Sequence, residues 1–317
     1  MTRIGMIGIG RMGLGIASNL VRHGRSLTVL DHPGNQPLDS LRAAGVTTRA
    51  TPAALAAEAD VLILCVTGTP EVEAVLMGDQ GVLEALRPGT VVIDCSTAVP
   101  ASTERLASAV VAAGGRFLDA PMTRTPKEAA EGRLNLLVGG DAALLDECRP
   151  ILACFAENII HAGPVGAGHR MKLVHNYVSL GSVALLAEAA ACAAGAGVDA
   201  GAFVQALTLG GGWGAALERL KPYLASGDTT GMLFTVANAH KDLSYYNRMA
   251  DDAGADRTVA AAIERTLAQA SRDSGPQSVM PELVTLIGAR AGGALPRDQG
   301  GTAGCTELAD AVCRRLG

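Results

Sequence analysis

The sequence predicts an α/β fold in which a doubly wound parallel sheet fills the first half of the chain and helices fill the second half. Short, continuously apolar runs alternate with alanine-rich helical stretches up to about residue 161. After the glycine-rich segment 163–168 the pattern changes, and helical periodicity continues to the end. A chain of 317 residues is also long for one domain and comfortable for two.

Six runs are apolar at successive positions, as expected of parallel strands covered on both faces. They are Ile4–Ile7, Leu27–Leu30, Val61–Val66, Thr90–Asp94, Arg116–Ala120 and Leu134–Val138. We expect Asn158–His161 to add a last strand. The helices predicted between them are Gly13–His23, Thr51–Glu58, Glu71–Leu76 and Pro100–Ala113.

The second half is predicted to be an all-helical domain of residues 165–317, with a hinge near its start at Gly166–Gly168. One long helix is expected over His169–Ala194. From Val183 onward it is apolar on almost every side, so it must be buried between domains or subunits, and a homodimer or homotetramer is expected. Gly288–Gly304 is expected to be a mobile loop before a last helix over Cys305–Leu316, and its role stays open.

Composition excludes several classes of protein. Hydrophobic residues make up 49% and charged residues 18%, which rules out an intrinsically disordered chain. A net charge of -5 and only 3% aromatic residues argue against nucleic-acid binding. The seven cysteines include no C-x-x-C pair and the six histidines no H-E-x-x-H spacing, so neither a disulfide framework nor a metal site is predicted. Without a recognisable signal peptide or membrane span, we expect a cytoplasmic protein.

A glycine motif follows the first predicted strand directly and opens the first predicted helix. Its six residues are Gly8, Ile9, Gly10, Arg11, Met12 and Gly13. Asp31 stands eighteen residues beyond the last glycine, at the end of the second strand. In this context the glycines allow a tight turn and close approach of a pyrophosphate to a helix N-terminus, while the acid accepts hydrogen bonds from ribose hydroxyls. The sequence therefore predicts a Rossmann-type dinucleotide-binding domain over residues 1–164.

Asp31 also bears on the choice of cofactor. A carboxylate there would repel a 2′-phosphate, and no arginine follows within residues 31–35, so NAD is favoured over NADP. The alternative interpretation treats Asp31 as an ordinary turn residue at a strand end, and that interpretation leaves the preference open.

Lys172 is the candidate acid/base of the second half. Reducing an aldehyde with hydride leaves an alkoxide that needs a proton, and oxidising the alcohol needs a base in the same place. With His175, Asn176 and Ser179 it lies at i, i+3, i+4 and i+7, on one face of an otherwise apolar helix. From periodicity alone, an ordinary solvated stripe explains this face equally well.

The chain resembles the β-hydroxyacid dehydrogenase family, which includes 3-hydroxyisobutyrate dehydrogenase and tartronate semialdehyde reductase. Four blocks in the family's order carry the resemblance: residues 8–20, residues 119–125, residues 166–172 with Asn176, and Lys241-Asp242-Leu243. The resemblance implies hydride transfer between NAD(H) and a small 3-hydroxy acid or its semialdehyde, with Lys172 as acid/base and Asn176 orienting it. It further implies cofactor contacts at Val66, Thr67, Thr97 and Lys241 and substrate contacts at Thr123, Arg124, Thr125 and Ser179.

The substrate segment departs from the family pattern, because Ser-Gly-Gly is replaced by Thr123-Arg124-Thr125. A planar cation suits a carboxylate, sulfonate or phosphonate. This variant is similar to sulfolactaldehyde reductases, which reduce a three-carbon sulfonated aldehyde, although their Asn-Asn pair reads His175-Asn176 here. Two alternatives stay open. Arg124 either binds substrate or pairs on the surface with Glu128 or Glu131, and His175 either contacts an acidic substrate group or packs within its helix.

Two further functions are weighed against a hydroxy-acid dehydrogenase. An imine reductase shares the architecture but replaces the lysine, so Lys172 argues against it. A non-catalytic NAD(H) sensor would keep the glycine motif and lose the acid/base residue, which this chain retains. Lys241 has its own alternative, a solvated charge on a helix.

Overall fold

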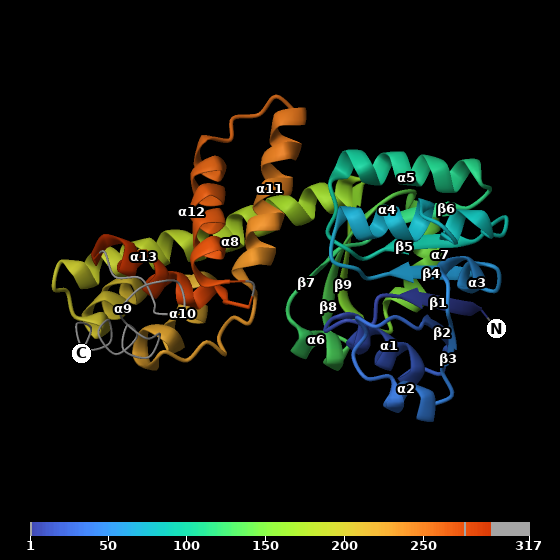
Figure 1. Ribbon diagram of the computed structural model, residues 1–317, viewed down its shortest axis with the longest axis horizontal. Helices are drawn as coiled ribbons and strands as arrows, with labels where there is room; N and C mark the ends of the chain where they lie inside the picture. The colour runs from blue at the N-terminus through green and yellow to red at the C-terminus, as the bar shows by residue number, and fades with distance from the viewer. Residues whose placement is uncertain (1, 276, 293–317) are drawn as a thin grey trace. The chain divides into compact units, whose positions relative to one another are not determined.

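The computed structural model describes residues 2–275 and 277–292 (Figure 1). Its backbone contacts divide the chain into two compact units, Met1–Leu173 and Val174–Gly317. The first unit contains the sheet. The second consists of helices and their connecting loops in its described part, with an isolated bridge between Thr235 and Val279.

Nine strands of the described residues form one sheet in the first unit, in the order β3-β2-β1-β4-β5-β6-β8-β7, with β9 beside β8. The strands are β1 Arg3–Ile7, β2 Ser26–Leu30, β3 Thr47–Arg49, β4 Val61–Leu64, β5 Val91–Asp94, β6 Arg116–Asp119, β7 Met122–Thr123, β8 Leu134–Gly139 and β9 Ala156–Gly163. The order reverses direction between β1 and β4. This reversal is the topological switch point at which doubly wound sheets bind their ligands.

The strands from β1 to β6 are parallel, so their carboxyl ends share one edge of the sheet. The register pairs Ile7 with Leu64, Leu64 with Asp94 and Asp94 with Asp119, which aligns the residues that follow each strand. The expectation of a wholly parallel sheet is wrong at β8, which runs antiparallel to β6 and β7. Burial on both faces makes a strand apolar whatever its direction, so the apolar runs carried no information on this point.

Two helical layers cover the sheet. Helices α1 Gly13–Arg22, α2 Asp39–Ala43, α6 Pro126–Glu131 and α7 Ala142–Leu152 pack in one apolar cluster with alternate strand residues such as Met6 and Ile63. Helices α3 Pro52–Ala56, α4 Thr69–Met77 and α5 Pro100–Ala112, with the 3₁₀ turn η1 Val82–Glu84, pack on the other face against residues such as Leu62 and Leu64. Figure 1 shows α4 and α5 on the face opposite α1 and α2.

One long helix, α8 Ala167–Gly195, carries the chain from the first unit into the second. The remaining elements of the second unit are α9 Ala200–Leu209, α10 Ala215–Ser226, α11 Val236–Asp252, α12 Thr258–Ser274, η2 Met280–Glu282 and α13 Leu283–Gly292. Buried residues of α8, including Leu180 and Val183, pack with α10, α11, α12 and α13 in a second apolar core.

Three expectations for the second half change. The predicted hinge Gly166–Gly168 overlaps the first turn of α8, since the helix begins at Ala167. Leu185 is 70% exposed on α8, so burial within this chain does not explain that apolar position. The predicted loop from Gly288 is wrong as far as Gly292, where α13 continues, and the rest of that loop and the helix Cys305–Leu316 lie outside the described residues.

Among the described residues, α8 is the one helix long and apolar enough to cross a bilayer, judged by length and composition alone. A core helix passes the same test, and α8 carries core residues of the second unit.

Candidate active site

The three glycines of the motif have different surroundings. At Gly8, φ is +96° and an added Cβ would lie 2.2 Å from Cys65 O, so only glycine fits this turn. At Gly13 the Cβ would lie 1.9 Å from Gly8 O, so a glycine there allows the start of α1 to pack closely against the loop. At Gly10 it would meet no heavy atom of the described residues within 4 Å. A tight turn, an open backbone and a close helix start are what a pyrophosphate-binding loop requires.

The segment after β2 holds the glycine loop in place. Ile9 N–H donates to Asn35 Oδ1 at 3.2 Å, and Gln36 N–H donates to Ile9 O at 2.7 Å. Asn35 in turn donates through Nδ2 to Leu30 O, 2.8 Å away. The sequence reasoning missed Asn35, because a single asparagine after a strand is typical of any turn.

Asp31 accepts a hydrogen bond from Arg42 Nη2 at 3.1 Å, and both side chains are about half exposed. Arg42 comes from α2, eleven residues beyond Asp31 and therefore outside residues 31–35. The carboxylate on which the expected preference for NAD depends therefore has a cation beside it.

The loops after β4 and β5 meet at the same edge of the sheet. Val66 N–H donates to Ser96 Oγ at 3.0 Å, which joins the two loops. Thr97, next to Ser96, is half-buried, and Thr67, next to Val66, is exposed. The predicted cofactor contacts Val66, Thr67 and Thr97 thus lie on neighbouring loops on the far side of the switch point from Asp31.

The predicted substrate segment lies at β7 and the start of α6. Thr123 is buried and its Oγ1 accepts a hydrogen bond from Asn135 at 3.0 Å. Thr125 is the N-cap of α6, where its side chain accepts from Lys127 N–H and the Glu128 carboxylate accepts from Thr125 N–H in return. This capping box explains the local sequence without any ligand.

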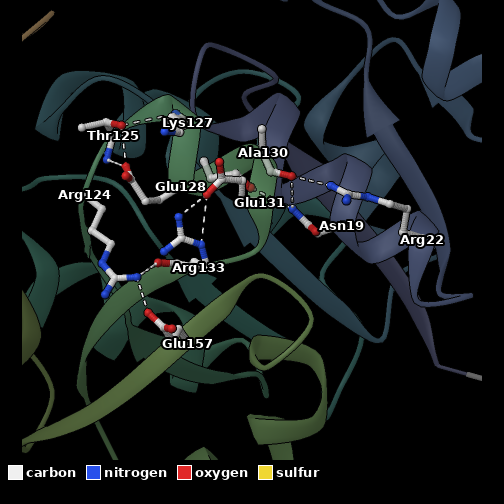
Figure 2. Close-up of polar contacts among 11 residues, drawn as sticks. Asn19, Arg22, Arg124, Thr125, Lys127, Glu128, Ala130, Glu131, Arg133 and Glu157 are labelled. Atoms are coloured by element: carbon white, nitrogen blue, oxygen red, sulfur yellow. Dashed lines mark hydrogen bonds and ion pairs between the residues drawn. The ribbon is translucent and has the colours of Figure 1, made fainter.

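Arg124 adopts φ +83°, in the left-handed region that favours glycine. Its guanidinium points toward Glu157 on β9, and Nη1 donates both to the Glu157 carboxylate and to the carbonyl oxygen of Arg133, just before β8 (Figure 2). The surface alternative expected Arg124 to pair with Glu128 or Glu131. That expectation is wrong, because the acidic partner of Arg124 is Glu157. Glu128 caps Thr125, and Glu131 pairs with Arg133.

On α8, Lys172 and Asn176 are both buried, one helical turn apart, at 9% and 5% exposure. Asn176 Nδ2 donates to Asp242 Oδ2 on α11 at 2.6 Å, and Lys241 Nζ lies 3.1 Å from Asp242 Oδ1. His175 Nδ1 lies 3.0 Å from Asn176 Oδ1. Lys172 and Asn176 are therefore not part of a solvated stripe, which was the alternative interpretation of this polar face. The face also contacts an acid from α11, Asp242, to which the sequence reasoning gave no role.

Ser179, the last residue of that face, is half-buried and lies 3.3 Å from Arg219 Nη1 on α10. Arg219 was not among the predicted residues. The sequence around Arg219 did not single it out, because it lies in an amphipathic helix with charged neighbours at Glu218 and Lys221.

Two family models cover most of the chain. Residues 3–163 match the NAD-binding domain of 6-phosphogluconate dehydrogenase, and residues 166–287 match the NAD-binding domain of NADP-dependent 3-hydroxyisobutyrate dehydrogenase. The chain belongs to the β-hydroxyacid dehydrogenase family. Members of this family are NAD(P)-dependent oxidoreductases that act on hydroxy acids, and this chain is one of them.

Relatives with different substrates are similar to this chain. An NAD-dependent L-serine dehydrogenase of Pseudomonas aeruginosa is 35% identical over 225 residues, which are 70% of this chain and 74% of the relative. A 3-sulfolactaldehyde reductase of Escherichia coli is 39% identical over 190 residues, which are 60% of this chain and 63% of the relative. The names of the relatives thus agree on the reaction class and differ in the substrate.

Solved structures agree with the fold. A Mycobacterium tuberculosis 3-hydroxyisobutyrate dehydrogenase with L-serine has a TM-score of 0.80 and 27% identity, over 90% of this chain and 98% of that one. An imine reductase from Myxococcus stipitatus has a TM-score of 0.59 and 20% identity, over 90% and 99%. At that identity the second match shows a shared fold alone.

The chain's own residues fit a dinucleotide. The open backbone at Gly10, the start of α1 with no side-chain cap and the exposed Asp31 carboxylate are groups of the kind that pyrophosphate and ribose require. Within the residues the structure describes, no group of three or more His, Cys, Asp or Glu side chains is arranged to hold a metal ion.

Proposed function

We propose that this chain transfers a hydride between NAD(H) and a small 3-hydroxy acid or its semialdehyde, of the 3-hydroxyisobutyrate or tartronate semialdehyde type. The observation that carries the proposal is the buried Lys172, with the fixed amide of Asn176 one turn further along the same helix. A buried amine is a costly feature that a merely structural helix face avoids.

The bound nicotinamide supplies or accepts the hydride at the reacting carbon. Lys172 gives the proton to the oxygen of the reduced carbonyl, and it removes that proton when the alcohol is oxidised. Asn176, held by Asp242, orients the reacting oxygen or the lysine. Thr123, Arg124, Thr125 and Ser179 hold the anionic end of the substrate. Lys241 reaches the cofactor or the substrate acid.

The experiment follows NADH oxidation with a panel of three-carbon semialdehydes that carry a carboxylate, a sulfonate or a phosphonate. Lys172→Ala should lower kcat by about 10²- to 10⁴-fold, the usual contribution of a general acid or base. Lys221→Ala is the matched control, because Lys221 pairs with Glu218 on α10. Unchanged kcat in Lys172→Ala would remove the mechanism, and no turnover of any carbonyl by the wild type would favour an NAD(H) sensor.

The second candidate is a sulfolactaldehyde reductase. The 39% identity to such an enzyme and the arginine at position 124 favour it. The same panel decides between the two, since kcat/KM for the sulfonated aldehyde should then exceed that for the carboxylated one. An imine reductase remains the more distant alternative, and loss of activity toward every hydroxy acid alongside cyclic-imine reduction would favour it.

We propose NAD rather than NADP as the preferred cofactor, because Asp31 lies at the end of β2. Asp31→Ser should bring the Kd values of NADH and NADPH closer by about tenfold, which corresponds to roughly 1.4 kcal/mol. Protein fluorescence titration measures both constants. If Arg42→Ala weakens NADPH binding in the wild-type background, the adjacent cation already admits a 2′-phosphate.

We further propose a division of labour at residues 164/165. Residues 1–164 bind the dinucleotide, and residues 165–317 supply Lys172 and the subunit contacts of a homodimer or homotetramer in the cytoplasm. Exposed apolar residues on α8, such as Val178 and Leu185 at 61% and 70%, support an oligomer. A small anionic substrate is the expected partner, with neither nucleic acid nor a membrane involved. Light scattering tests the oligomer, and a monomer at micromolar concentration would contradict it.

A further inference from the structure

His169, in the first turn of α8, is completely buried, and it lies between two buried carboxylates that the proposed mechanism does not use. Its Nε2 is 3.9 Å from Asp94 Oδ2, and its Nδ1 is 3.8 Å from Asp119 Oδ2. The three side chains are at most 1% exposed. Burial of this much polar material is costly unless its hydrogen bonds are made.

Asp119, the last residue of β6, caps α8 from outside the helix. Its Oδ1 accepts from Gly166 N–H and its Oδ2 accepts from His169 N–H, both at 2.8 Å. These are backbone donors at the start of a helix, where no earlier turn supplies an acceptor. An acid near a helix N-terminus also interacts favourably with the helix dipole. The Asp119 carboxylate therefore attaches the start of α8 to the sheet through two backbone N–H groups.

The imidazole of His169 makes two further attachments to the same unit. Nε2 lies 3.1 Å from Ser96 O, just after β5, and a carbonyl oxygen can only accept, so Nε2 carries the hydrogen. Nδ1 lies 2.8 Å from Thr103 Oγ1 on α5. The ring thus connects α8 to both the sheet edge and the helix layer above it. We call the four side-chain and backbone partners Ser96, Thr103, Asp119 and His169 the α8 anchor.

The backbone around the α8 anchor is closely packed, which limits movement of the first turn of α8. A Cβ at Gly168 would lie 2.3 Å from Leu137 O and 2.8 Å from Asp119 Oδ2, so the backbone of the first turn touches β8 and the capping carboxylate directly. Asp94 Oδ1 accepts from Ser96 N–H, while Oδ2 has no hydrogen-bond partner within the described residues. Burial raises the pKa of the Asp94 carboxyl, against the lowering influence of His169 and Ser96.

Lys172 follows His169 by three residues, less than one helical turn. Any tilt or rotation of the first turn of α8 is therefore transmitted to Lys172 with little loss, since a helix is stiff over that length. We propose that His169 is a positioning residue, and that the α8 anchor fixes the location of the acid/base Lys172. This inference rests on the proposed role of Lys172. It adds that the position of the Lys172 side chain is set by the buried hydrogen bonds of the α8 anchor.

The test compares variants that cut one anchor contact at a time. Thr103→Val removes the partner of Nδ1, and Thr90→Val is the matched control. Thr90 and Thr103 are both at most 2% exposed, and each hydroxyl lies 3.2 Å from a backbone carbonyl oxygen, but the oxygen beside Thr90 is that of Ala59, away from α8. His169→Leu removes both ring contacts, and His169→Gln keeps a donor that can reach Ser96 O.

Three readouts are followed: kcat and KM for the best semialdehyde, the Kd of NADH by fluorescence, and amide hydrogen exchange over residues 166–173. A misplacement of about 1 Å in a catalytic group can cost on the order of 10²-fold. We expect His169→Leu to lower kcat by at least tenfold and to leave the Kd of NADH unchanged. His169→Gln should recover several-fold of the lost kcat. Thr103→Val should lower kcat more than Thr90→Val does. Exchange over 166–173 should accelerate in the anchor variants alone.

The inference is overturned if kcat in His169→Leu stays within twofold of wild type, or if Thr90→Val loses as much kcat as Thr103→Val. Failure of the proposed function looks different. In that case Lys172→Ala keeps the wild-type kcat, while hydrogen exchange over residues 166–173 still reports whether the anchor holds the helix.

Discussion

Asn176 Nδ2 and Asp242 Oδ2 are 2.6 Å apart, and both side chains are buried. The carboxylate can only accept, so it fixes the amide group of Asn176 in one of its two orientations. Asp242→Asn would remove a hydrogen bond to a charged group, worth about 1.5–3 kcal/mol, and would let the Asn176 amide flip. We expect a loss of stability of that size in urea unfolding and a drop in kcat of about tenfold.

Asp251→Asn is the control for that prediction, because Asp251 lies on the same helix with its side chain 63% exposed, paired with Arg257. Its effect on both quantities should be small. Equal kcat in Asp242→Asn and Asp251→Asn would show that the orientation of Asn176 does not matter to catalysis.

Glu157 competes with substrate for Arg124, if Arg124 binds the anionic end as proposed. Glu157→Gln removes the competing charge, and the 45% exposure of Glu157 limits the gain to that of a surface ion pair, about 0.2–1 kcal/mol. KM for an anionic aldehyde should fall by about 1.4- to fivefold, with kcat unchanged. Glu147→Gln, which breaks the surface pair with Arg116, should leave KM alone. A KM that rises in Glu157→Gln would mean that the pair holds Arg124 in its binding position.

Thr125 has a structural role whether or not it contacts substrate. As the N-cap of α6 its side chain accepts from Lys127 N–H, so Thr125→Ala should lower the free energy of unfolding by about 1 kcal/mol. Thr125→Ser keeps the hydroxyl and should restore most of it. Chemical denaturation measures both variants, and KM measured alongside reports any substrate contact. Identical stability of Thr125→Ala and wild type would contradict the capping role.

Acid stability should depend on Asp60. The hydrogen bonds from the Arg3 side chain and backbone hold the pKa of this carboxyl below its usual range, against a small opposing effect of burial. A lowered folded-state pKa contributes stability above the unfolded pKa, near 4, and that contribution is lost as the pH falls below it. Asp60→Asn should therefore be less stable than wild type at pH 7, and the difference should shrink between pH 4 and pH 2.

Urea unfolding at pH 7, 4 and 3 follows that difference, with Asp146→Asn as the control. Asp146 is 72% exposed and pairs with Arg149 within one helix. A constant difference between Asp60→Asn and wild type across this range would contradict the linkage.

Long buried elements were the part of the fold that the sequence could predict. Gly13–His23 and Pro100–Ala113 differ from the observed α1 and α5 by one residue at the end, because their apolar spacing is strong. The strands β3 and β7 were missed, since three and two residues carry no periodicity. Helix α7 was also missed; it contains Pro150, a residue that argues against a helix interior.

The site was predictable where chemistry is local and unpredictable where it depends on tertiary partners. The glycine motif specifies its own loop, and Lys172 and Asn176 share a helix face at fixed spacing. Asp242, Arg219 and Glu157 are separated from their partners by 66, 40 and 33 residues of chain, respectively. The spacing of residues along the chain does not predict such long-range contacts.

Gly15, two residues beyond the motif, lies where α1 meets α6. A Cβ there would be 2.5 Å from the carbonyl carbon of Ala129, and Asn19 Nδ2 donates to the carbonyl oxygens of both Gly15 and Ala129 at 2.8 Å. A genetic screen that scores lost NAD binding would group a Gly15 substitution with defects in phosphate recognition. Its true origin would be a collision between two helices, so a second-site change that shortens the α6 segment is the kind of suppressor such a screen should recover.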